Sequence, residues 1–287
     1  MKVLITGATG NVGLSVINAI SHKSNNIEIY AGVRNILADS HKLKDYNVSL
    51  VTFDFENTQT FKPALQGIDI MFLLRPPQLA DVHRYFNPLI DEAGRSNIKL
   101  IIFLSVQGVE NSKIIPHHKI EKLITNSKIE FTFLRPAYFM QNFTTTLLAD
   151  LVKKHRIYLP AGQAKFTLID VDDIGAVTAK ILSEPKQHFN KCYELTNGEI
   201  LTFSEMAEKI SMGTGKLIKF ISPNLLRFYL TKRKENVSSM YIFVLIMLHY
   251  FPRFEKTQRI TQCVKNLTGK EPKSFDEFVQ SNIRLIF

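Results

Sequence analysis

"VLITGATGNVGLSVI" spans Val3 to Ile17 and contains three glycines, Gly7, Gly10 and Gly13, at intervals of three residues. They follow a short apolar run and precede a stretch whose apolar residues recur with helical spacing. A glycine-rich turn between a strand and a helix lets the backbone approach a pyrophosphate, because no Cβ stands in the way, and the helix N-terminus offers N–H groups. The segment therefore predicts a phosphate-binding turn, with a purely structural tight turn as the alternative.

The first two-thirds of the chain alternate strand-like and helix-like runs. The expected strands are 2–6, 27–34, 48–55, 69–76, 99–106 and 130–139, and the expected helices are 11–23, 59–68, 79–97 and 118–127. Continuous apolar strands separated by helices are typical of a parallel sheet covered on both faces. We predict an α/β fold with a doubly wound parallel sheet of the Rossmann type. A TIM barrel is disfavoured because the pattern fades after about residue 150.

The rest of the chain has a different pattern. A short strand with a helix over 166–185 and a strand over 191–197 complete the first domain, which we expect to cover 1–155 and 166–197. Capping-box spacings, Thr202 with Glu205 and Ser274 with Glu277, begin helical stretches further on. We therefore predict a smaller, mostly helical C-terminal cap over 198–287.

Composition limits the partners. The 287 residues carry a net charge of +10, and residues 201–287 hold 14 Lys and Arg against 7 Asp and Glu. The densest basic piece, 231–237, indicates a solvated surface, with an anion-binding surface as the alternative. No helix-turn-helix, zinc or aromatic-basic RNA motif accompanies it, which argues against a nucleic-acid partner.

Cellular context follows from two further observations. Cys192 and Cys263 are isolated, and no secretory leader pattern opens the chain, so we expect a reduced, cytoplasmic protein. The most apolar stretch, 240–248, is shorter than the roughly 20 residues that span a bilayer, so no membrane partner is expected. A buried helix is predicted there, with an interfacial or partner-binding helix as the alternative.

The end of the second strand discriminates between cofactors. NAD sites place an Asp or Glu there for the ribose hydroxyls, whereas this chain has Arg34. A guanidinium can hold a 2′-phosphate through forked, charge-assisted hydrogen bonds. The residues therefore predict NADP(H) in preference to NAD(H).

Six segments carry a family resemblance: "ITGATGNVG", "AGVRN", "FDFEN", "LLRPP", "LSVQGVE" and "FTFLRPAYFMQNF". Their order resembles that of atypical short-chain dehydrogenase/reductases of the NmrA-like family, including bacterial NAD(P)H:quinone reductases and triphenylmethane-reductase-like proteins. The resemblance runs from Met1 to about Tyr193 and continues more thinly over the cap.

The resemblance implies a set of cofactor-binding residues at the carboxyl ends of the strands. They are Thr6, Gly7, Thr9, Gly10, Asn11, Val12 and Gly13 for the phosphates, Arg34 for the 2′-phosphate, Asp54 and Phe55 for the adenine, Leu73, Leu74, Arg75, Ser105 and Val106 for the nicotinamide ribose, and Pro136, Ala137, Tyr138 and Phe139 for the far side of the nicotinamide. Lys119 matches the family's lysine, which would hold the ribose or balance negative charge. A helix N-cap is the alternative role of Asp54.

The catalytic machinery departs from the usual short-chain reductase. None of the tyrosines is followed four residues later by lysine, which argues against ketone reduction and sugar-nucleotide epimerisation. We expect instead hydride transfer to a quinone or similar conjugated, aromatic small molecule, with Lys119, His118 and Tyr138 as candidate catalytic residues. No metal is expected, because His117 and His118 lack a third ligand.

Other functions stay open at this level. The same fold could serve as a non-catalytic NADP(H)-sensing regulator that binds a protein partner, and an enzyme resembling nucleotide-sugar epimerases is a third possibility. A homodimer is also left open. The apolar strand ends and the helical cap favour an enzyme with an enclosed pocket.

Overall fold

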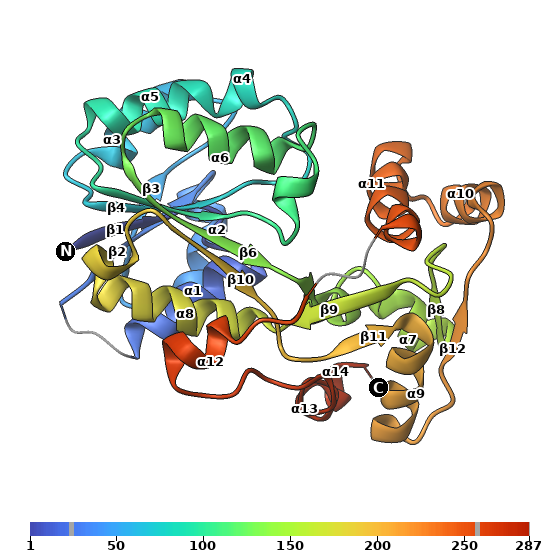
Figure 1. Ribbon diagram of the computed structural model, residues 1–287. Helices are drawn as coiled ribbons and strands as arrows, with labels where there is room; N and C mark the ends of the chain where they lie inside the picture. Colours follow the sequence, from blue (N-terminus) through green and yellow to red (C-terminus); the bar gives the residue numbers. More distant parts are fainter. Residues whose placement is uncertain (23–25, 256–258, 287) are drawn as a thin grey trace. The chain divides into compact units, whose positions relative to one another are not determined.

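A computed structural model describes residues 1–22, 26–255 and 259–286, which form two compact units (Figure 1). Unit 1 consists of Met1–Pro136, Val171–Leu195 and Cys263–Lys270, and unit 2 of Ala137–Asp170, Thr196–Gln262 and Glu271–Phe287. Residues 137–155 lie in unit 2. The predicted division into a first domain of 1–155 with 166–197 and a cap of 198–287 stays a prediction.

Unit 1 is built on one sheet of seven strands in the order β10-β6-β5-β4-β1-β2-β3. The strands are β1 (Lys2–Ile5), β2 (Glu28–Val33), β3 (Val48–Thr52), β4 (Ile70–Leu74), β5 (Leu100–Leu104), β6 (Glu130–Pro136) and β10 (Lys191–Leu195). Every neighbouring pair is parallel. The chain order reverses between β1 and β4, which is where open α/β sheets bind ligands. The predicted doubly wound parallel sheet is confirmed.

Helices cover both faces of this sheet (Figure 1). They are α1 (Asn11–Ser21), α2 (Ile36–Leu43), α3 (Phe61–Leu65), α4 (Val82–Tyr85), α5 (Asn87–Arg95), α6 (Pro116–Asn126), α8 (Val171–Ser183) and α12 (Cys263–Thr268), with 3-10 turns at 58–60, 109–111 and 185–188. α3, α5 and α6 lie on one face, and α1, α8 and α12 on the other. The central strands β1, β4 and β5 are buried along almost their whole length, which accounts for their continuous apolar sequences, whereas β3, at the edge of the sheet, has no fully buried residue.

Three predicted helices differ from the observed ones. The stretch 79–97 forms two helices, because Pro88 has no N–H to donate and its ring conflicts with the carbonyl four residues earlier. The stretch 59–68 is helical only to Leu65. α1 ends at Ser21, and residue 23 of the predicted helix lies outside the described residues. α2 was not predicted.

Unit 2 has smaller sheets and its own core. Its strands are β7 (Tyr138–Phe139), β8 (Arg156–Tyr158), β9 (Lys165–Ile169), β11 (Ile200–Thr202) and β12 (Lys219–Ile221), in a sheet β11-β9-β7 and a pair β12-β8. Its helices are α7 (Leu148–Lys154), α9 (Phe203–Thr214), α10 (Leu225–Lys234), α11 (Ser239–His249), α13 (Phe275–Ser281) and α14 (Ile283–Ile286), with 3-10 turns at 140–144 and 251–254. Both predicted capping boxes are present, at Thr202 and at Ser274. The predicted mostly helical character of the C-terminal region, 198–287, is confirmed.

Among the described residues, no helix has the length and apolarity that crossing a membrane requires.

Candidate functional site

The glycine turn lies between β1 and α1, at the carboxyl end of the sheet. Gly7 has a φ of +63°, and its carbonyl accepts a hydrogen bond of 3.0 Å from the Gly10 N–H. A Cβ built on Gly13 would lie 2.3 Å from the Gly7 oxygen and 2.8 Å from the Ala8 Cα. Gly7 is therefore required for its left-handed backbone, and Gly13 is required for the close approach of helix to turn.

The start of α1 faces this turn without a side-chain cap. Gly10 is the residue before the helix, and no side chain accepts a hydrogen bond there. Asn11 is exposed and Thr9 half-buried, whereas Val12 is buried. The first-turn N–H groups and the partial positive charge of the helix are thus positioned as an anion site.

Thr6 holds the turn against the neighbouring strand. Its buried hydroxyl donates to the Phe72 carbonyl at 3.1 Å and accepts from the Leu74 N–H at 2.9 Å. These bonds join the ends of β1 and β4 at the point where the strand order reverses. Thr6 therefore supports the turn through its own side chain.

The predicted adenine side of the site follows β2 and β3. Arg34 comes directly after β2 and is exposed. The Asp54 carboxylate accepts from the Glu56 N–H at 3.0 Å, so it forms a local turn and does not cap a helix. The Phe55 ring is buried against Phe53 and Phe86, with centroids 5.0 and 5.3 Å away, so its side chain belongs to the core.

The end of β4 carries an arginine–histidine pair that the sequence prediction missed. Leu73 is buried, and Leu74 lies on the turn, since its Cδ2 is 3.2 Å from a Cβ built on Gly7. Arg75 Nε donates to His117 Nε2 at 3.3 Å, and its Nη1 donates to three carbonyls of residues 76–79.

Burial sets the charge state of this pair. It lowers the pKa of Arg75 to about 10, which leaves the guanidinium charged at neutral pH. Burial, followed by the charge of Arg75, lowers the pKa of His117 to about 3. His117 is thus a neutral imidazole that accepts at Nε2 and carries its proton on Nδ1.

Two buried polar atoms near the end of β5 lack a partner among residues 1–22, 26–255 and 259–286. They are Ser105 Oγ and His118 Nε2. His118 lies at the start of α6 and its Nδ1 donates to the Val109 carbonyl at 3.3 Å, which leaves the lone pair on Nε2. Since buried polar groups are normally hydrogen-bonded, these atoms are available to a ligand. Ser105 and His118 were both predicted as site residues.

The remaining predicted residues fall into two groups. Lys119 is exposed on α6, Val106 is half-buried, and Pro136 is buried at the end of β6, all in unit 1. Ala137, Tyr138 and Phe139 follow in unit 2, because the expected strand 130–139 divides after Pro136 and its last two residues pair with β9. Unit 1 by itself therefore brings together the glycine turn, Leu74 and Arg75.

Within unit 2, Tyr138 is hydrogen-bonded by a residue that no sequence pattern singled out. Its hydroxyl hydrogen-bonds His249 Nε2 at 3.0 Å, and the rings of Phe166 and Phe203 lie 5.5 and 5.7 Å away. His249 Nδ1 donates to the Leu245 carbonyl at 2.7 Å. Burial raises the pKa of the Tyr138 phenol and lowers that of His249 to about 4. This pair is neutral at physiological pH.

A metal centre has no support in the described part of the chain, where no three His, Cys, Asp or Glu side chains lie close enough together to hold an ion.

Two histidines of the candidate site were not predicted from the sequence. The signal that could have revealed His117 was its position beside His118 at the start of a helix. His249 had no comparable signal, because Tyr138 is 111 residues away.

Comparison with known proteins agrees with the resemblance. Prestalk A differentiation protein A of Dictyostelium discoideum is 29% identical over 282 residues, which is 98% of this chain and 92% of that protein. Quinone oxidoreductase 2 of Escherichia coli is 26% identical over 222 residues, 76% of each chain. Its structure with NADPH has a TM-score of 0.84 at 21% identity and covers 97% of this chain and 99% of that one.

A third protein shares the fold. The structure of Citrobacter sp. triphenylmethane reductase complexed with NADP(H) has a TM-score of 0.84 at 21% identity, covering 98% of this chain and 99% of that one. The model of the NmrA-like family matches residues 1–279. The predicted resemblance is confirmed: the chain belongs to the NmrA-like family.

Proposed function

We propose that this protein is an NADP(H)-dependent oxidoreductase that transfers hydride to a quinone or similar conjugated electrophile. The glycine turn carries the proposal: Gly7 and Gly13 are required by the backbone itself, and the uncapped start of α1 lies beside them. The relatives named as a quinone oxidoreductase and a triphenylmethane reductase support the class of reaction.

The residues present fit a dinucleotide. The glycines of the turn have no Cβ atoms that would keep a pyrophosphate from approaching the backbone closely. Ser105 Oγ is a buried hydroxyl without a hydrogen-bond partner among the described residues. We assign the first-turn N–H groups of α1 to the pyrophosphate and the exposed guanidinium of Arg34 to the 2′-phosphate. Ser105 and Leu74 border the ribose in this assignment. Lys119 remains a candidate for the same ribose.

NADPH, when bound, supplies a hydride. The chain's own residues would orient the acceptor and stabilise the negative charge that the hydride brings to it. His117 is neutral, and the Arg75 guanidinium already donates hydrogen bonds to the carbonyls of the loop that follows it. Neither side chain is therefore placed to stabilise a localised negative charge on an oxygen of the acceptor. A conjugated acceptor requires less such stabilisation, because its negative charge is delocalised. We assign His118, whose Nε2 carries a free lone pair, as the group in unit 1 that accepts a hydrogen bond from the hydroxyl of the reduced, hydroquinone-type product.

The alternative is a non-catalytic NADP(H) sensor that regulates a protein partner. The absence of a Tyr-x-x-x-Lys pair favours it, and so does the hydrogen bond that ties Tyr138 to His249. Both functions use the same turn, so cofactor binding alone does not separate them.

Turnover separates them. The full chain is mixed with NADPH and a panel of quinones and triphenylmethane dyes, and NADPH absorbance is followed. Oxidation of NADPH that depends on the acceptor, and that falls at least about tenfold in the variant His118→Ala, supports the enzyme. Saturable binding of NADPH without turnover across the panel supports the sensor instead. A His22→Ala variant, altered at the end of α1, is the matched control.

A further inference from the structure

Helix α11 is apolar on every side, yet most of it is uncovered. Only Ile242, Leu245 and His249 are buried. The exposed fraction is 73% at Met240, 60% at Phe243 and 53% at Met247. A helix that is apolar all round is normally buried on all sides, so α11 presents a face that lacks its cover.

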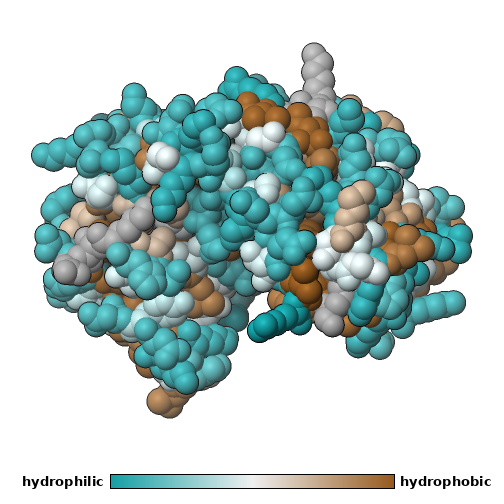
Figure 2. All heavy atoms as spheres, turned by 90° about the horizontal axis from the view of Figure 1, so that it is seen from below, coloured by the Kyte–Doolittle hydropathy of each residue, from teal (hydrophilic) through white to brown (hydrophobic). Residues whose placement is uncertain are grey.

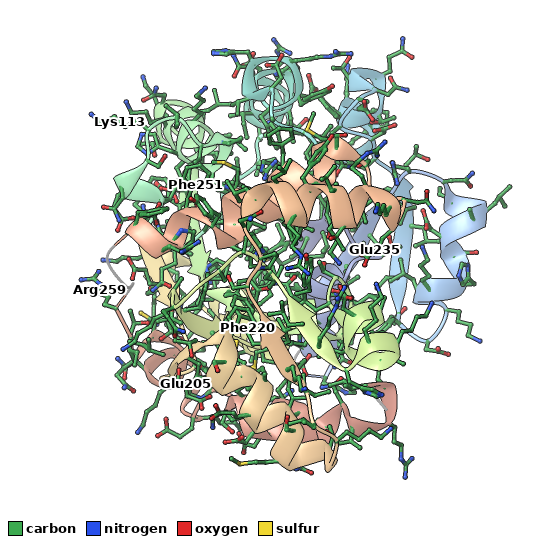
Figure 3. All side chains as sticks on the ribbon, turned by 90° about the vertical axis from the view of Figure 1, so that its right-hand side faces the viewer. Lys113, Glu205, Phe220, Glu235, Phe251 and Arg259 are labelled. Atoms are coloured by element: carbon green, nitrogen blue, oxygen red, sulfur yellow. The ribbon has the colours of Figure 1, made fainter. Side chains whose placement is uncertain are left out.

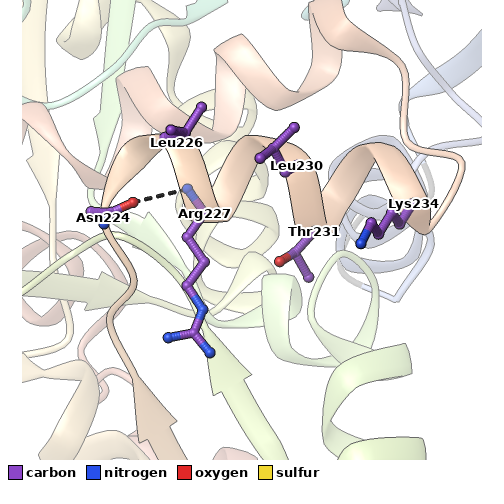
Figure 4. Close-up of a pocket in the computed structure, with 6 residues that line it drawn as sticks. All are labelled: Asn224, Leu226, Arg227, Leu230, Thr231 and Lys234. Atoms are coloured by element: carbon purple, nitrogen blue, oxygen red, sulfur yellow. Dashed lines mark hydrogen bonds between the residues drawn. The ribbon is translucent and has the colours of Figure 1, made fainter.

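The surface extends onto α10, which packs against α11 and joins it through a 3.0 Å hydrogen bond between Tyr229 and Ser239. Leu226 and Leu230 are exposed on α10 and, one turn apart, share a face. They line a hollow of about 390 Å³ together with Arg227 and Lys234 (Figure 4). Apolar and basic side chains thus occur together.

The positive charge on α10 is uncompensated. Within the described ranges, no carboxylate pairs with Arg227, Arg233 or Lys234, whereas the neighbouring Lys232 pairs with Asp150 and Glu235. Figure 3 labels Glu235, which follows α10, and Phe251, which follows α11. Phe251 and Phe254 add exposed rings just beyond α11. Figure 2 shows hydrophobic patches set among hydrophilic residues on one face of the molecule.

We propose that this α10–α11 surface, made of the exposed side chains of 226–254, docks on an anionic lipid bilayer. Protein surfaces that lie in a membrane interface place Phe and Leu side chains at the acyl boundary and Lys and Arg at the headgroups, and here α11 supplies the apolar part and α10 the cations. Such binding needs no spanning length. The expectation that no membrane partner exists rested only on spanning length, and the interfacial helix was the alternative at 240–248.

Charge decides between a bilayer and a second copy of the chain. A twofold interface would bring the same patch of each copy together, and with it Arg227, Arg233 and Lys234 from both. An anionic surface instead complements these cations, each of which strengthens binding. The net charge of +10 acts in the same direction.

Vesicle sedimentation of the full chain tests the proposal. The wild type should pellet with vesicles of phosphatidylserine and phosphatidylcholine, and should do so far less with phosphatidylcholine alone or in high salt. The double variants Arg227→Glu/Lys234→Glu and Phe243→Ser/Met247→Ser should each partition at least about tenfold more weakly.

Matched controls isolate the surface. Lys62→Glu/Lys122→Glu changes the charge equally at exposed positions of α3 and α6, and Leu37→Ser/Met212→Ser removes apolar side chains that are 91% and 81% exposed elsewhere. Both controls should pellet like the wild type. Circular dichroism confirms that each variant is folded.

Three results would overturn the proposal. The first is a wild type that stays in solution with anionic vesicles, and the second is a set of α10–α11 variants that pellet as well as the controls. Analytical ultracentrifugation supplies the third: a wild-type dimer that becomes a monomer in Phe243→Ser/Met247→Ser would identify a second copy as the occupant. None of these readouts depends on cofactor binding or turnover.

Discussion

The Tyr138 hydroxyl donates a 3.0 Å hydrogen bond to Nε2 of His249, whose own N–H on Nδ1 is fixed by the Leu245 carbonyl. This arrangement defines the tautomer of His249. It also engages the hydroxyl proton of Tyr138, one of the candidate catalytic residues, in a hydrogen bond to His249. Within unit 2 the pair acts as a polar link inside an aromatic core.

Tyr138→Phe should therefore lower the free energy of unfolding by about 1–3 kcal/mol, because His249 Nε2 is left buried without a partner. Urea unfolding followed by circular dichroism measures the change. Tyr241→Phe is the control: its hydroxyl bonds Thr146 at an exposed position and should cost less than about 0.5 kcal/mol. Equal costs for the two variants would contradict the assignment.

The pKa of His249 predicts acid sensitivity. Burial lowers it from 6.5 to about 4, so the unfolded chain binds the proton more readily than the folded one. Stability from this group is complete above about pH 6.5 and is lost as the pH falls toward 4, by up to about 3 kcal/mol. His117, with its pKa lowered to about 3, acts in the same direction.

Unfolding free energies measured between pH 7 and pH 4 test this prediction. In His249→Phe the slope of stability against pH should be shallower than in the wild type, because residue 249 no longer titrates. An unchanged slope would show that His249 is accessible to protons in the fold.

Replacing glycine by alanine should have opposite effects on stability at the turn and at an exposed helix position. Gly13→Ala places a Cβ against the Gly7 carbonyl and the Ala8 backbone, which cannot rotate away, and should cost about 1–3 kcal/mol and abolish NADPH binding. Gly94→Ala in α5 meets nothing within 4 Å and should stabilise by about 0.4–1 kcal/mol.

Gly175→Ala is the control that separates loss of NADPH binding from general destabilisation in Gly13→Ala. Its Cβ would lie 2.6 Å from the Ser15 carbonyl, so it disturbs the packing of α8 on α1 away from the turn. It should destabilise the protein while NADPH binding at low temperature persists. Thermal unfolding and calorimetric titration give the two readouts, and loss of binding in both variants would mean that the effect of Gly13→Ala is only destabilisation.

Arg75→Lys tests the loop that follows β4. A single ammonium cannot reach His117 and the carbonyls of Pro76, Pro77 and Leu79 together, so hydrogen exchange of the Leu79 N–H, which donates to the Pro76 carbonyl at 3.0 Å, should accelerate. Arg95→Lys, at an exposed pair with Glu92, should leave exchange in α5 unchanged. Protection of the Leu79 N–H equal to that of the wild type would show that the guanidinium does not hold the loop.

Local patterns predicted the parallel sheet because its buried strands are continuous apolar runs. They missed α2, whose only buried residue is Leu43 and whose Leu37 is almost fully exposed, so it has no apolar stripe to detect. They also carried the strand past Pro136, because only pairing with β9 reveals that Tyr138 begins another sheet.

The candidate site also contains parts that local sequence patterns could predict and parts that they could not. The glycine turn is specified within seven consecutive residues, so the sequence alone could place it. The neutral state of His117 depends on burial beside Arg75, 42 residues earlier, and no local signal reports that contact. The family resemblance implies an adenine contact for Phe55, which stays a prediction, whereas the packing of its ring against Phe86 in the core depends on a residue 31 positions away and has no local signal.

Calorimetric titration of NADPH and NADH into the wild type and Arg34→Asp tests the central claim most directly, with Arg95→Asp as the matched control. We expect one NADPH site per chain, weaker binding of NADH, and a preference that shifts toward NADH by at least about tenfold in Arg34→Asp but not in the control. No binding of either nucleotide to the wild type, or unchanged NADPH affinity in Arg34→Asp, would contradict the account.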